Sequence, residues 1–137
     1  MAFDADGKIL GLRAKTIANI GAYMSTFSSA IPTYMYATLL SGQYAIPQIY
    51  SEVDAVYTNT VPVDAYRGAG RPEAAYFMER LIEQAARQIG IDSADIRRRN
   101  LIPPSKLPYA TPTLWNYDSG EFTRLMDKCI ERSDAKG

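Results

Sequence analysis

Hydrophobic and polar positions follow two different patterns along the chain. In the first half, short runs of β-branched and other apolar residues are bounded by Gly, Pro and Asx positions, which is typical of strands. This pattern predicts a short strand at Met1–Phe3, a strand from about Lys8 to Ala18 and another from Gln48 to Thr58. Between the two longer strands, a short helix is expected from about Thr33 to Leu40, because Pro32 suits a first helical turn.

The strongest helical signal begins at Pro72 and ends at Ile89, just before Gly90. Glu73 favours the positive end of the helix dipole, and Gly90 suits a left-handed residue after the last turn. Apolar residues recur between these ends at helical spacing: Ala74, Phe77, Met78, Leu81, Ile82, Ala85 and Ile89.

Two further helices are predicted towards the end of the chain. One starts at Asp92, with Asp95 three residues later as in a capping box, and the other starts at Asp118, with Glu121 in the equivalent place. The segment Leu101–Tyr117 contains four prolines and is expected to be irregular. In the last helix a buried stripe is expected, with Cys129 as a packed thiol: Phe122, Leu125, Met126, Cys129 and Ile130.

Together these elements predict an α+β fold, with a small sheet of two to four strands and about three helices packed on one side. Residues 1–137 read as a single partial domain, since no internal linker divides them. So few strands do not complete a sheet, which indicates that partner strands lie elsewhere. A sheet edge left exposed can also pair with a second copy, so a homodimer is one expected state.

Composition excludes several classes of function. Fifteen basic and fifteen acidic residues cancel, which argues against binding to nucleic acid or to an anionic membrane. The sequence has no histidine and one cysteine, so it cannot form a Ser-His-Asp triad, a His-ligated metal site or an internal disulfide. The single thiol suits a reducing cytoplasm, and no apolar run is long enough to span a membrane.

One segment resembles a binding site: the loop Asp64–Glu73, which leads into the predicted helix at Pro72. Gly68 and Gly70 let backbone N–H groups approach a ligand, and Arg67 and Arg71 add permanent positive charge. This arrangement suits an oxyanion such as a phosphate, a carboxylate or a metal-oxo group.

Other interpretations of these residues remain open at this stage. The loop lacks the third glycine of a dinucleotide site and the Gly-Lys-Ser/Thr of a P-loop, and its arginines can simply pair with surface carboxylates. Arg97, Arg98 and Arg99 can contact an anion, but a solvated helix face is the favoured interpretation.

Ala65-Tyr66-Arg67-Gly68-Ala69-Gly70-Arg71-Pro72-Glu73-Ala74 resembles the active-site loop of the xanthine dehydrogenase/aldehyde oxidase family, which includes carbon monoxide dehydrogenase large subunits. Further blocks in the same order are also similar to that family: Asp6-Gly7-Lys8-Ile9, Ile20-Gly21-Ala22-Tyr23, Tyr57-Thr58-Asn59-Thr60, Arg97-Arg98-Arg99-Asn100-Leu101-Ile102, Pro108-Tyr109 and Tyr117-Asp118-Ser119-Gly120.

The resemblance implies a fragment of a cytoplasmic molybdenum hydroxylase large subunit, within a larger molybdopterin-binding domain. Such enzymes hydroxylate aldehydes or heterocycles at a molybdopterin cofactor, usually the cytosine dinucleotide form in bacteria. Their electrons leave through iron–sulfur and flavin components. By position, Arg67, Gly68, Ala69 and Gly70 are the expected cofactor-binding residues, and the chain is expected to hold no metal ligand and no bound cofactor by itself.

Departures from the family pattern narrow these expectations. Copper-containing carbon monoxide dehydrogenases carry Cys-Ser-Phe at Gly68-Ala69-Gly70, and purine hydroxylases carry a stacking phenylalanine at Ala69, so neither carbon monoxide nor a purine is the expected substrate. The family's glutamate base lies outside this chain, which is therefore expected to be inactive without the rest of the large subunit. The alternative is a stand-alone module that binds an anion or a partner protein without catalysis.

Overall fold

A computed structural model describes residues 1–133. Its elements in chain order are β1 (Ala2–Phe3), β2 (Ile9–Asn19), a π-helical turn (Ile31–Met35), α1 (Tyr36–Thr38), β3 (Ile49–Val56), α2 (Arg71–Ile89), α3 (Ser93–Asn100), a 3₁₀ turn (Pro104–Lys106), β4 (Tyr109–Ala110), β5 (Asn116–Tyr117) and α4 (Phe122–Ser133). The α+β prediction of a small sheet with helices is confirmed.

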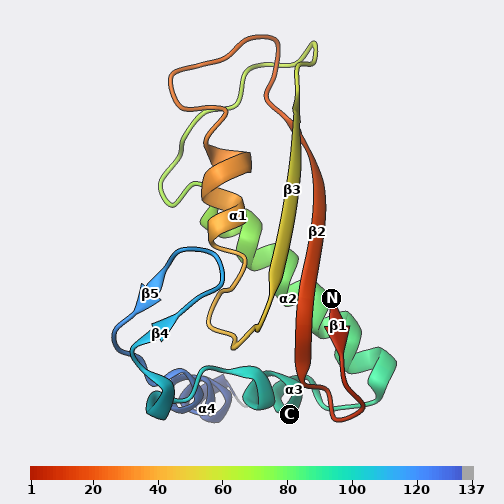
Figure 1. Cartoon of the computed structure of the whole chain (residues 1–137), viewed down its shortest axis with the longest axis vertical. Coiled ribbons are helices and arrows are strands. Elements are labelled where there is room, and N and C mark those ends of the chain that lie inside the picture. Colours follow the sequence, from red (N-terminus) through yellow and green to blue (C-terminus); the bar gives the residue numbers. More distant parts are fainter. Residues whose placement is uncertain (134–137) are drawn as a thin grey trace.

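The main sheet has three strands in the order β1-β2-β3. β2 and β3 are parallel, with Leu12 opposite Ile49 and Asn19 opposite Val56, while β1 pairs antiparallel with the start of β2. Parallel neighbours require a crossover connection, and here the crossover contains the π-helical turn and α1. Figure 1 shows both long strands side by side, ending at the same edge of the sheet.

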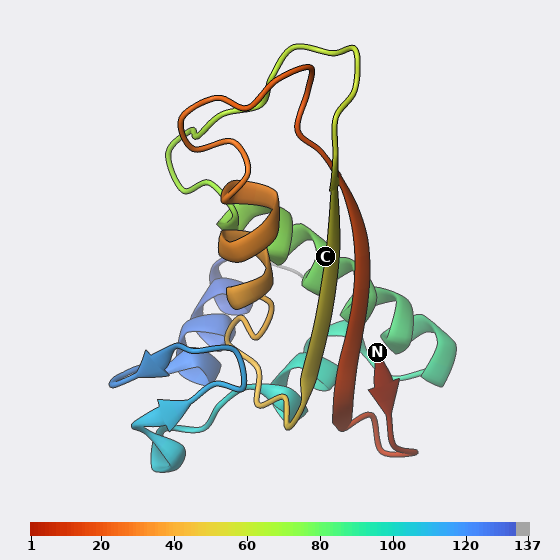
Figure 2. The ribbon, with the colours of Figure 1, turned by 45° about the horizontal axis from the view of Figure 1, so that its top comes forward.

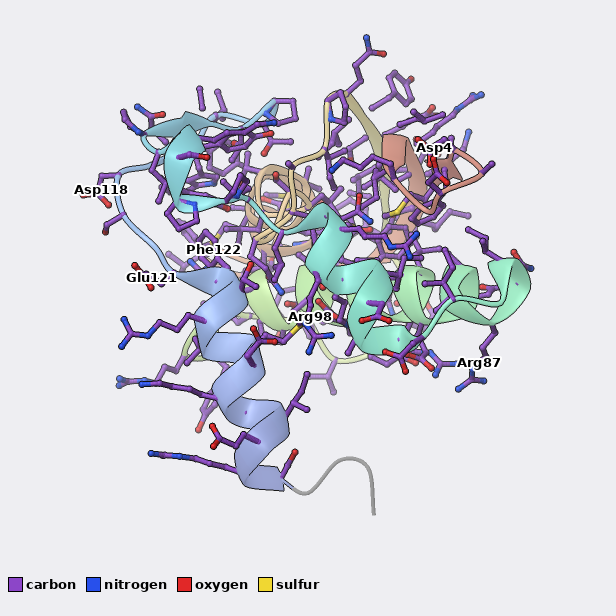
Figure 3. The ribbon with its side chains drawn as sticks, turned by 90° about the horizontal axis from the view of Figure 1, so that it is seen from below. Asp4, Arg87, Arg98, Asp118, Glu121 and Phe122 are labelled. Atoms are coloured by element: carbon purple, nitrogen blue, oxygen red, sulfur yellow. The ribbon has the colours of Figure 1, made fainter. Side chains whose placement is uncertain are left out.

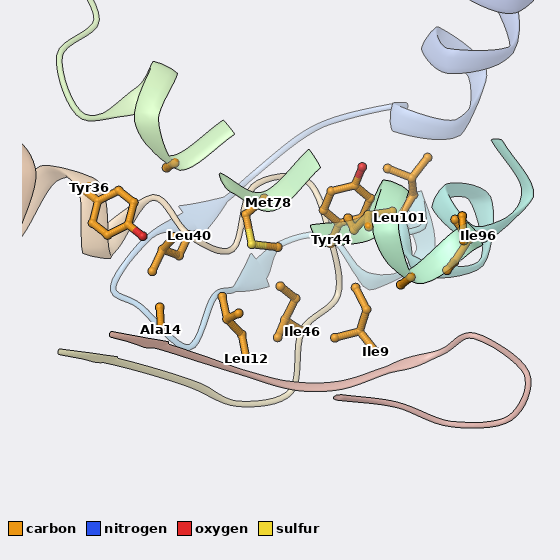
Figure 4. Close-up of a cluster of buried hydrophobic side chains, with 14 residues drawn as sticks. Ile9, Leu12, Ala14, Tyr36, Leu40, Tyr44, Ile46, Met78, Ile96 and Leu101 are labelled. Carbon is orange, nitrogen blue, oxygen red and sulfur yellow. The ribbon is translucent and has the colours of Figure 1, made fainter. Parts of the chain in front are cut away.

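The hydrophobic core fills the space between one face of the sheet and the helices. Ile9, Leu12 and Ala14 point from β2 towards Leu40 and Met78, which come from the helical side (Figure 4). The opposite face of the sheet is exposed, and on it Lys15 of β2 forms an ion pair with Glu52 of β3 at 2.9 Å. The buried and exposed positions of β2 therefore largely alternate, as is typical of a strand that is covered on one side.

Helix α2 forms where the sequence predicts it. Pro occupies its first turn, and Gly90 ends it in a left-handed conformation with φ of 77°, its N–H donating to the Ala86 carbonyl. The predicted helix between β2 and β3 is also present, but it starts at Ile31 as a π-helical turn and continues as α-helix only to Thr38.

A buried asparagine joins the two ends of the fold. The side-chain oxygen of Asn100, in α3, accepts the N–H of Ile9 at 2.8 Å. Its amide nitrogen donates to the carbonyls of Gly7 at 2.7 Å and Ile96 at 2.8 Å. Asn100 is 1% exposed, so these bonds form away from water and hold the start of β2 on the end of α3.

Of the predicted caps of the last two helices, one is confirmed and one is wrong. Asp92 caps α3 by accepting the N–H groups of Ala94 and Asp95, as expected, whereas the Asp95 carboxylate pairs with Arg98 and does not reach back. The predicted start of α4 at Asp118 is wrong: the helix begins at Phe122, and the Asp118 carboxylate accepts the Ser119 hydroxyl.

The expected buried stripe on α4 is also wrong. Figure 3 shows α4 projecting from the body of the molecule, with Phe122 at its inner end. Only Phe122 and Met126 pack against the core, and Arg98 of α3 pairs with Asp127 at 2.8 Å. Cys129 is therefore exposed and is not the packed thiol that its apolar neighbours predict, because nothing among residues 1–133 covers that side of the helix.

The proline-rich segment 101–117 is less irregular than expected. It contains a 3₁₀ turn and a small antiparallel pair in which Tyr109 lies opposite Tyr117. Strands of two residues are too short to produce a recognisable period in the sequence, so the pattern could not predict them.

The Asn100 bonds generate a stability prediction. In Asn100→Ala, the Ile9 N–H and two carbonyls lose their partners in a buried place, so we expect a loss of about 3 kcal/mol in the free energy of unfolding. Urea unfolding followed by circular dichroism measures it. Asn59→Ala is the matched control, since Asn59 is exposed, and an equal effect of both variants would contradict the role of Asn100.

Candidate functional site

The carboxyl ends of β2 and β3 carry two loops that lie along each other. Residues 20–30 follow β2 and residues 57–70 follow β3, and both views show them side by side at the top of the molecule (Figures 1 and 2). Two backbone bonds join them: the Thr58 N–H donates to the Gly21 carbonyl at 2.9 Å, and the Ala22 N–H donates to the Thr60 carbonyl at 3.1 Å. Ligands in sheets with parallel strands commonly bind at this edge.

Gly21 permits the closest approach between the loops. Its φ is +84°, and a Cβ at this position would lie 2.4 Å from the Cα of Pro62. The second loop can therefore run directly against the first only because residue 21 has no side chain.

The predicted site residues 67–70 form a tight turn directly before α2. The turn is closed by its own backbone, since the Ala69 N–H donates to the Tyr66 carbonyl at 2.9 Å and the Arg71 N–H donates to the Gly68 carbonyl at 3.0 Å. The sequence therefore places Arg67, Gly68, Ala69 and Gly70 together, as expected from their adjacency.

The two glycines of this turn have different surroundings. Gly70 is buried, with φ of +86°, and a Cβ there would lie 2.6 Å from the Cβ of Met35. Gly68 also has a positive φ of +83°, but no atom lies within 4 Å of the position its Cβ would take. Gly70 thus lets α2 start against the π-helical turn, whereas Gly68 faces open space that a ligand can enter.

Both arginines beside the turn are without a carboxylate partner among the described residues. The open alternative, in which Arg67 and Arg71 merely pair with surface carboxylates, is therefore not what residues 1–133 do. Within the same range, the N–H groups of Gly68 and Gly70 also donate to no protein oxygen. The turn consequently presents positive charge and unused donors, which suits an anionic, oxygen-rich group.

A cavity of about 360 Å³ opens beside this turn. Gly68, Ala69 and Arg71 form one side, and most of the remaining wall is aromatic or aliphatic. The wall residues from other segments are Phe27, Tyr34, Met35, Thr38, Leu39 and Trp115. A pocket of this size, mainly apolar with a few polar groups, is typical of sites for small organic molecules.

These wall residues belong to no common sequence motif, because they come from separate parts of the chain. One signal was available: no charged residue occurs between Lys15 and Glu52. Phe27, Tyr34 and Met35 all belong to that uncharged stretch. A long stretch without charge that still reaches the surface indicates a segment covered by a ligand or by other protein.

A family model for the molybdopterin cofactor-binding domain matches residues 1–101. The chain belongs to this family. The carbon monoxide dehydrogenase large chain of Afipia carboxidovorans is 37% identical over 133 residues, covering 96% of this chain and 16% of that relative. The gamma subunit of the 6-hydroxypseudooxynicotine dehydrogenase complex of Paenarthrobacter nicotinovorans is 34% identical over 142 residues, covering 98% of this chain and 17% of that relative.

Solved structures agree with this molybdopterin-binding assignment. Quinoline 2-oxidoreductase from Pseudomonas putida 86 superposes with a TM-score of 0.90 at 31% identity, over 98% of this chain and 17% of that chain. The aldehyde oxidoreductase from Desulfovibrio gigas gives a TM-score of 0.80 at 25% identity, over 98% and 14% respectively. The chain thus spans about one-sixth of the length of the relatives that it matches.

The residues of the turn fit the cofactor that this family implies. A molybdopterin centre is rich in anionic oxygen, and the turn offers two unpaired guanidinium groups. The open side of Gly68 leaves room for a large group to approach the backbone. Residues 1–133 contain no cluster of three or more His, Cys, Asp or Glu side chains that could hold a metal ion.

The other arginine group, at residues 97–99, has a structural role. Arg97 is largely buried, and its Nε lies 2.9 Å from a carboxylate oxygen of Glu79 in α2. Arg98 pairs with Asp95 and Asp127, and Arg99 donates to the carbonyl of Asp6. The favoured interpretation of a solvated helix face holds for Arg98 and Arg99, which are exposed, but not for Arg97, which is partly buried beside Glu79.

Glu79 also receives a hydrogen bond from the core. The hydroxyl of Tyr44 donates to a Glu79 oxygen at 2.7 Å. Burial, and then the bond to Glu79, raise the pKa of Tyr44 well above its ordinary value. The Tyr44–Glu79–Arg97 group thereby joins the segment before β3 to both α2 and α3.

No helix of the described residues has the length and apolar character needed to cross a membrane.

The different surroundings of the two turn glycines predict different costs of the same substitution. Gly70→Ala combines positive-φ strain of about 1–2 kcal/mol with overpacking of about 1–3 kcal/mol against Met35, so we expect a loss of roughly 3–4 kcal/mol. Gly68→Ala has the strain alone and should lose about 1 kcal/mol. Urea midpoints of the two variants test this, and equal losses would contradict the packing described for Gly70.

The raised pKa of Tyr44 predicts that the free energy of unfolding decreases at alkaline pH. A tyrosine in the unfolded chain ionises near about pH 10, whereas the folded chain keeps the Tyr44 proton, so this contribution is complete below about pH 10 and is lost above it. Tyr44→Phe should reduce the decline in unfolding free energy between pH 10 and 11 by about 1 kcal/mol. The control is Tyr57→Phe, at an exposed tyrosine, which should leave this decline unchanged. If the unfolding free energy of the unmodified chain and of Tyr44→Phe declined equally between pH 10 and 11, the prediction would be refuted.

Proposed function

We propose that this chain forms one wall of the molybdopterin centre in a molybdenum hydroxylase of the xanthine dehydrogenase/aldehyde oxidase type. In this proposal Arg67, Gly68, Ala69 and Gly70 lie against the cofactor. The observation that carries it is the open side of Gly68, at φ of +83°, next to arginines without a carboxylate partner.

When bound, the cofactor supplies the two-electron chemistry that hydroxylates an aldehyde or a heterocycle with oxygen from water. The residues of this chain bind and orient. Arg67 holds an anionic group by its guanidinium donors, and the unused N–H of Gly68 is available to the same group. Because Gly70 is packed against Met35, the turn keeps a fixed position on α2, which precise placement at a reaction centre requires.

The apolar cavity beside the turn is the proposed place for the substrate. Its aromatic walls, from Phe27, Tyr34 and Trp115, exclude water and favour a flat or apolar molecule. Neither a copper thiolate nor a stacked purine fits this wall. Residues 68–70 include no cysteine, the single Cys129 is in α4, and Ala69 has no ring.

The rest of the centre is expected on the remainder of a large subunit. A glutamate base, most of the cofactor contacts and the cytosine dinucleotide form of the cofactor belong to that proposal, as do iron–sulfur and flavin partners and a cytoplasmic location. Two relatives that cover nearly the whole chain are named as a complex subunit and a large subunit, which supports an assembly of several chains. The chain by itself is proposed to be inactive.

A pair of matched glycine variants tests the proposed function. Gly68 and Gly90 both have positive φ and open space around a would-be Cβ, but only Gly68 is at the proposed centre, since Gly90 ends α2. In the large subunit that contains this sequence, Gly68→Ala should lower the bound molybdenum by about tenfold or more, whereas Gly90→Ala should leave it unchanged. Molybdenum analysis of the purified enzyme measures both.

Several results would contradict this proposal. Equal molybdenum content in the two variants would remove the turn from the centre. Oxidation of aldehydes by the 137-residue chain alone would overturn the idea that the chain needs the rest of a subunit. Tight binding of an oxyanion by the isolated chain, without any larger assembly, would favour a stand-alone binding module.

A further inference from the structure

The turn of Arg67 and Gly68 lies between two fixed points of the chain. One is Gly70, packed against Met35. The other is Asp64, whose carboxylate joins the second loop to the first. The backbone bonds between the two loops end at Thr60, and the bonds within 65–71 only close the turn upon itself. The position of the turn relative to the first loop therefore depends on Asp64 and Gly70.

Asp64 uses both carboxylate oxygens in this connection. The hydroxyl of Ser25, in the loop after β2, donates to one oxygen. The N–H of Ala65 donates to the other at 2.7 Å. The Ser25 hydroxyl, and then the Ala65 N–H, lower the pKa of Asp64, so both bonds are made to a charged acceptor at neutral pH.

Ser25 is itself held in place by a buried neighbour. Its N–H donates to the hydroxyl oxygen of Ser28 at 3.1 Å, and the Ser28 hydroxyl donates back to the Ser25 carbonyl at 3.4 Å. Ser28 is 0% exposed, so this local turn is anchored in the interior. A carboxylate bound to Ser25 is thus bound to a fixed point of the fold.

We propose that Asp64 is a positioning residue, which sets Arg67 and Gly68 against the cofactor by fixing the start of their loop on Ser25. This inference rests on the proposed function of the turn. Asp64 contacts neither cofactor nor substrate in this role. It acts through residues 65–69, which it holds from one end while Gly70 holds them from the other.

The first measurement is amide hydrogen exchange in the 137-residue chain. Asp64→Ala should raise exchange of the two hydrogen-bonded amides, those of Ala65 and Ala69, by about tenfold, because the Ala65 N–H loses its acceptor and the turn loses its link to Ser25. Asp64→Asn keeps an acceptor for Ala65 and should restore most of the protection. Glu52→Ala is the control, because Glu52 is another hydrogen-bonded carboxylate on the outer face of the sheet.

The second measurement separates positioning from stability. In the assembled enzyme, Asp64→Ala should lower kcat and bound molybdenum severalfold, while the urea midpoint of the chain stays close to that of Glu52→Ala. A general loss of stability would instead raise exchange in the core amides as well, and Asp64→Asn would then not restore kcat. That result would overturn the positioning role, and so would unchanged exchange of the Ala69 amide in Asp64→Ala.

The two proposals fail in different ways. If Gly68→Ala loses molybdenum and Asp64→Ala keeps both molybdenum and kcat, the turn belongs to the centre and Asp64 does not position it. If Gly68→Ala itself keeps molybdenum and activity, the proposed function is wrong, and the proposed role of Asp64 is then wrong as well.

Discussion

Because β2 and β3 run in the same direction, both strands end at one edge of the sheet, and the segments that leave them meet there. The crossover between parallel strands also has to return along the sheet, which brings the π-helical turn and α1 over the core face. The start of α2 then lies between that helical segment and the second loop. The uncharged stretch, the glycine turn and the aromatic cavity therefore come together as a consequence of strand direction.

The segments that meet at this edge are held in fixed positions because their backbones pack closely against each other at two glycines. Gly21 allows the two loops to touch, and Gly70 allows α2 to start against Met35. At both places a side chain would have to occupy the same space as a neighbouring backbone or Cβ atom. Gly68 has a similar positive φ with nothing within 4 Å of a would-be Cβ, so this open glycine lies close to two glycines that are tightly packed. That contrast distinguishes a glycine needed for folding from one that leaves room for a ligand.

Most of the fold could be predicted where the local pattern agrees with the final environment. The long strands, α2 and the Asp92 cap are of this kind, since each is determined by residues close in sequence. The wrong predictions concern residues whose exposure depends on contacts with parts of the chain that are distant in sequence. Arg97 is partly buried because it pairs with Glu79 of another helix, and Cys129 is exposed because nothing in the described residues packs on that side of α4.

The candidate site divides in the same way. Its turn was recognisable from adjacent residues and their resemblance to a family, whereas the cavity wall combines Phe27 and Trp115, which are far apart in sequence. The link between Ser25 and Asp64 was equally invisible, because a hydrogen bond between residues 39 positions apart leaves no local pattern. The chemistry of the turn was thus accessible from the sequence, but its support was not.

The bonds of Asn100 also have a consequence for how the chain folds during synthesis. They join residues 91 and 93 positions apart, so β1 and β2 emerge from the ribosome long before the side chain that fixes them exists. The apolar face of β2 is without the cover of α2 until residues 71–89 have been made, and without the Asn100 anchor until α3 has followed. The nascent chain therefore passes through a period in which its first strands are exposed to aggregation or to chaperones, and that period ends only after α3 has left the ribosome and its Asn100 can bond to Gly7 and Ile9.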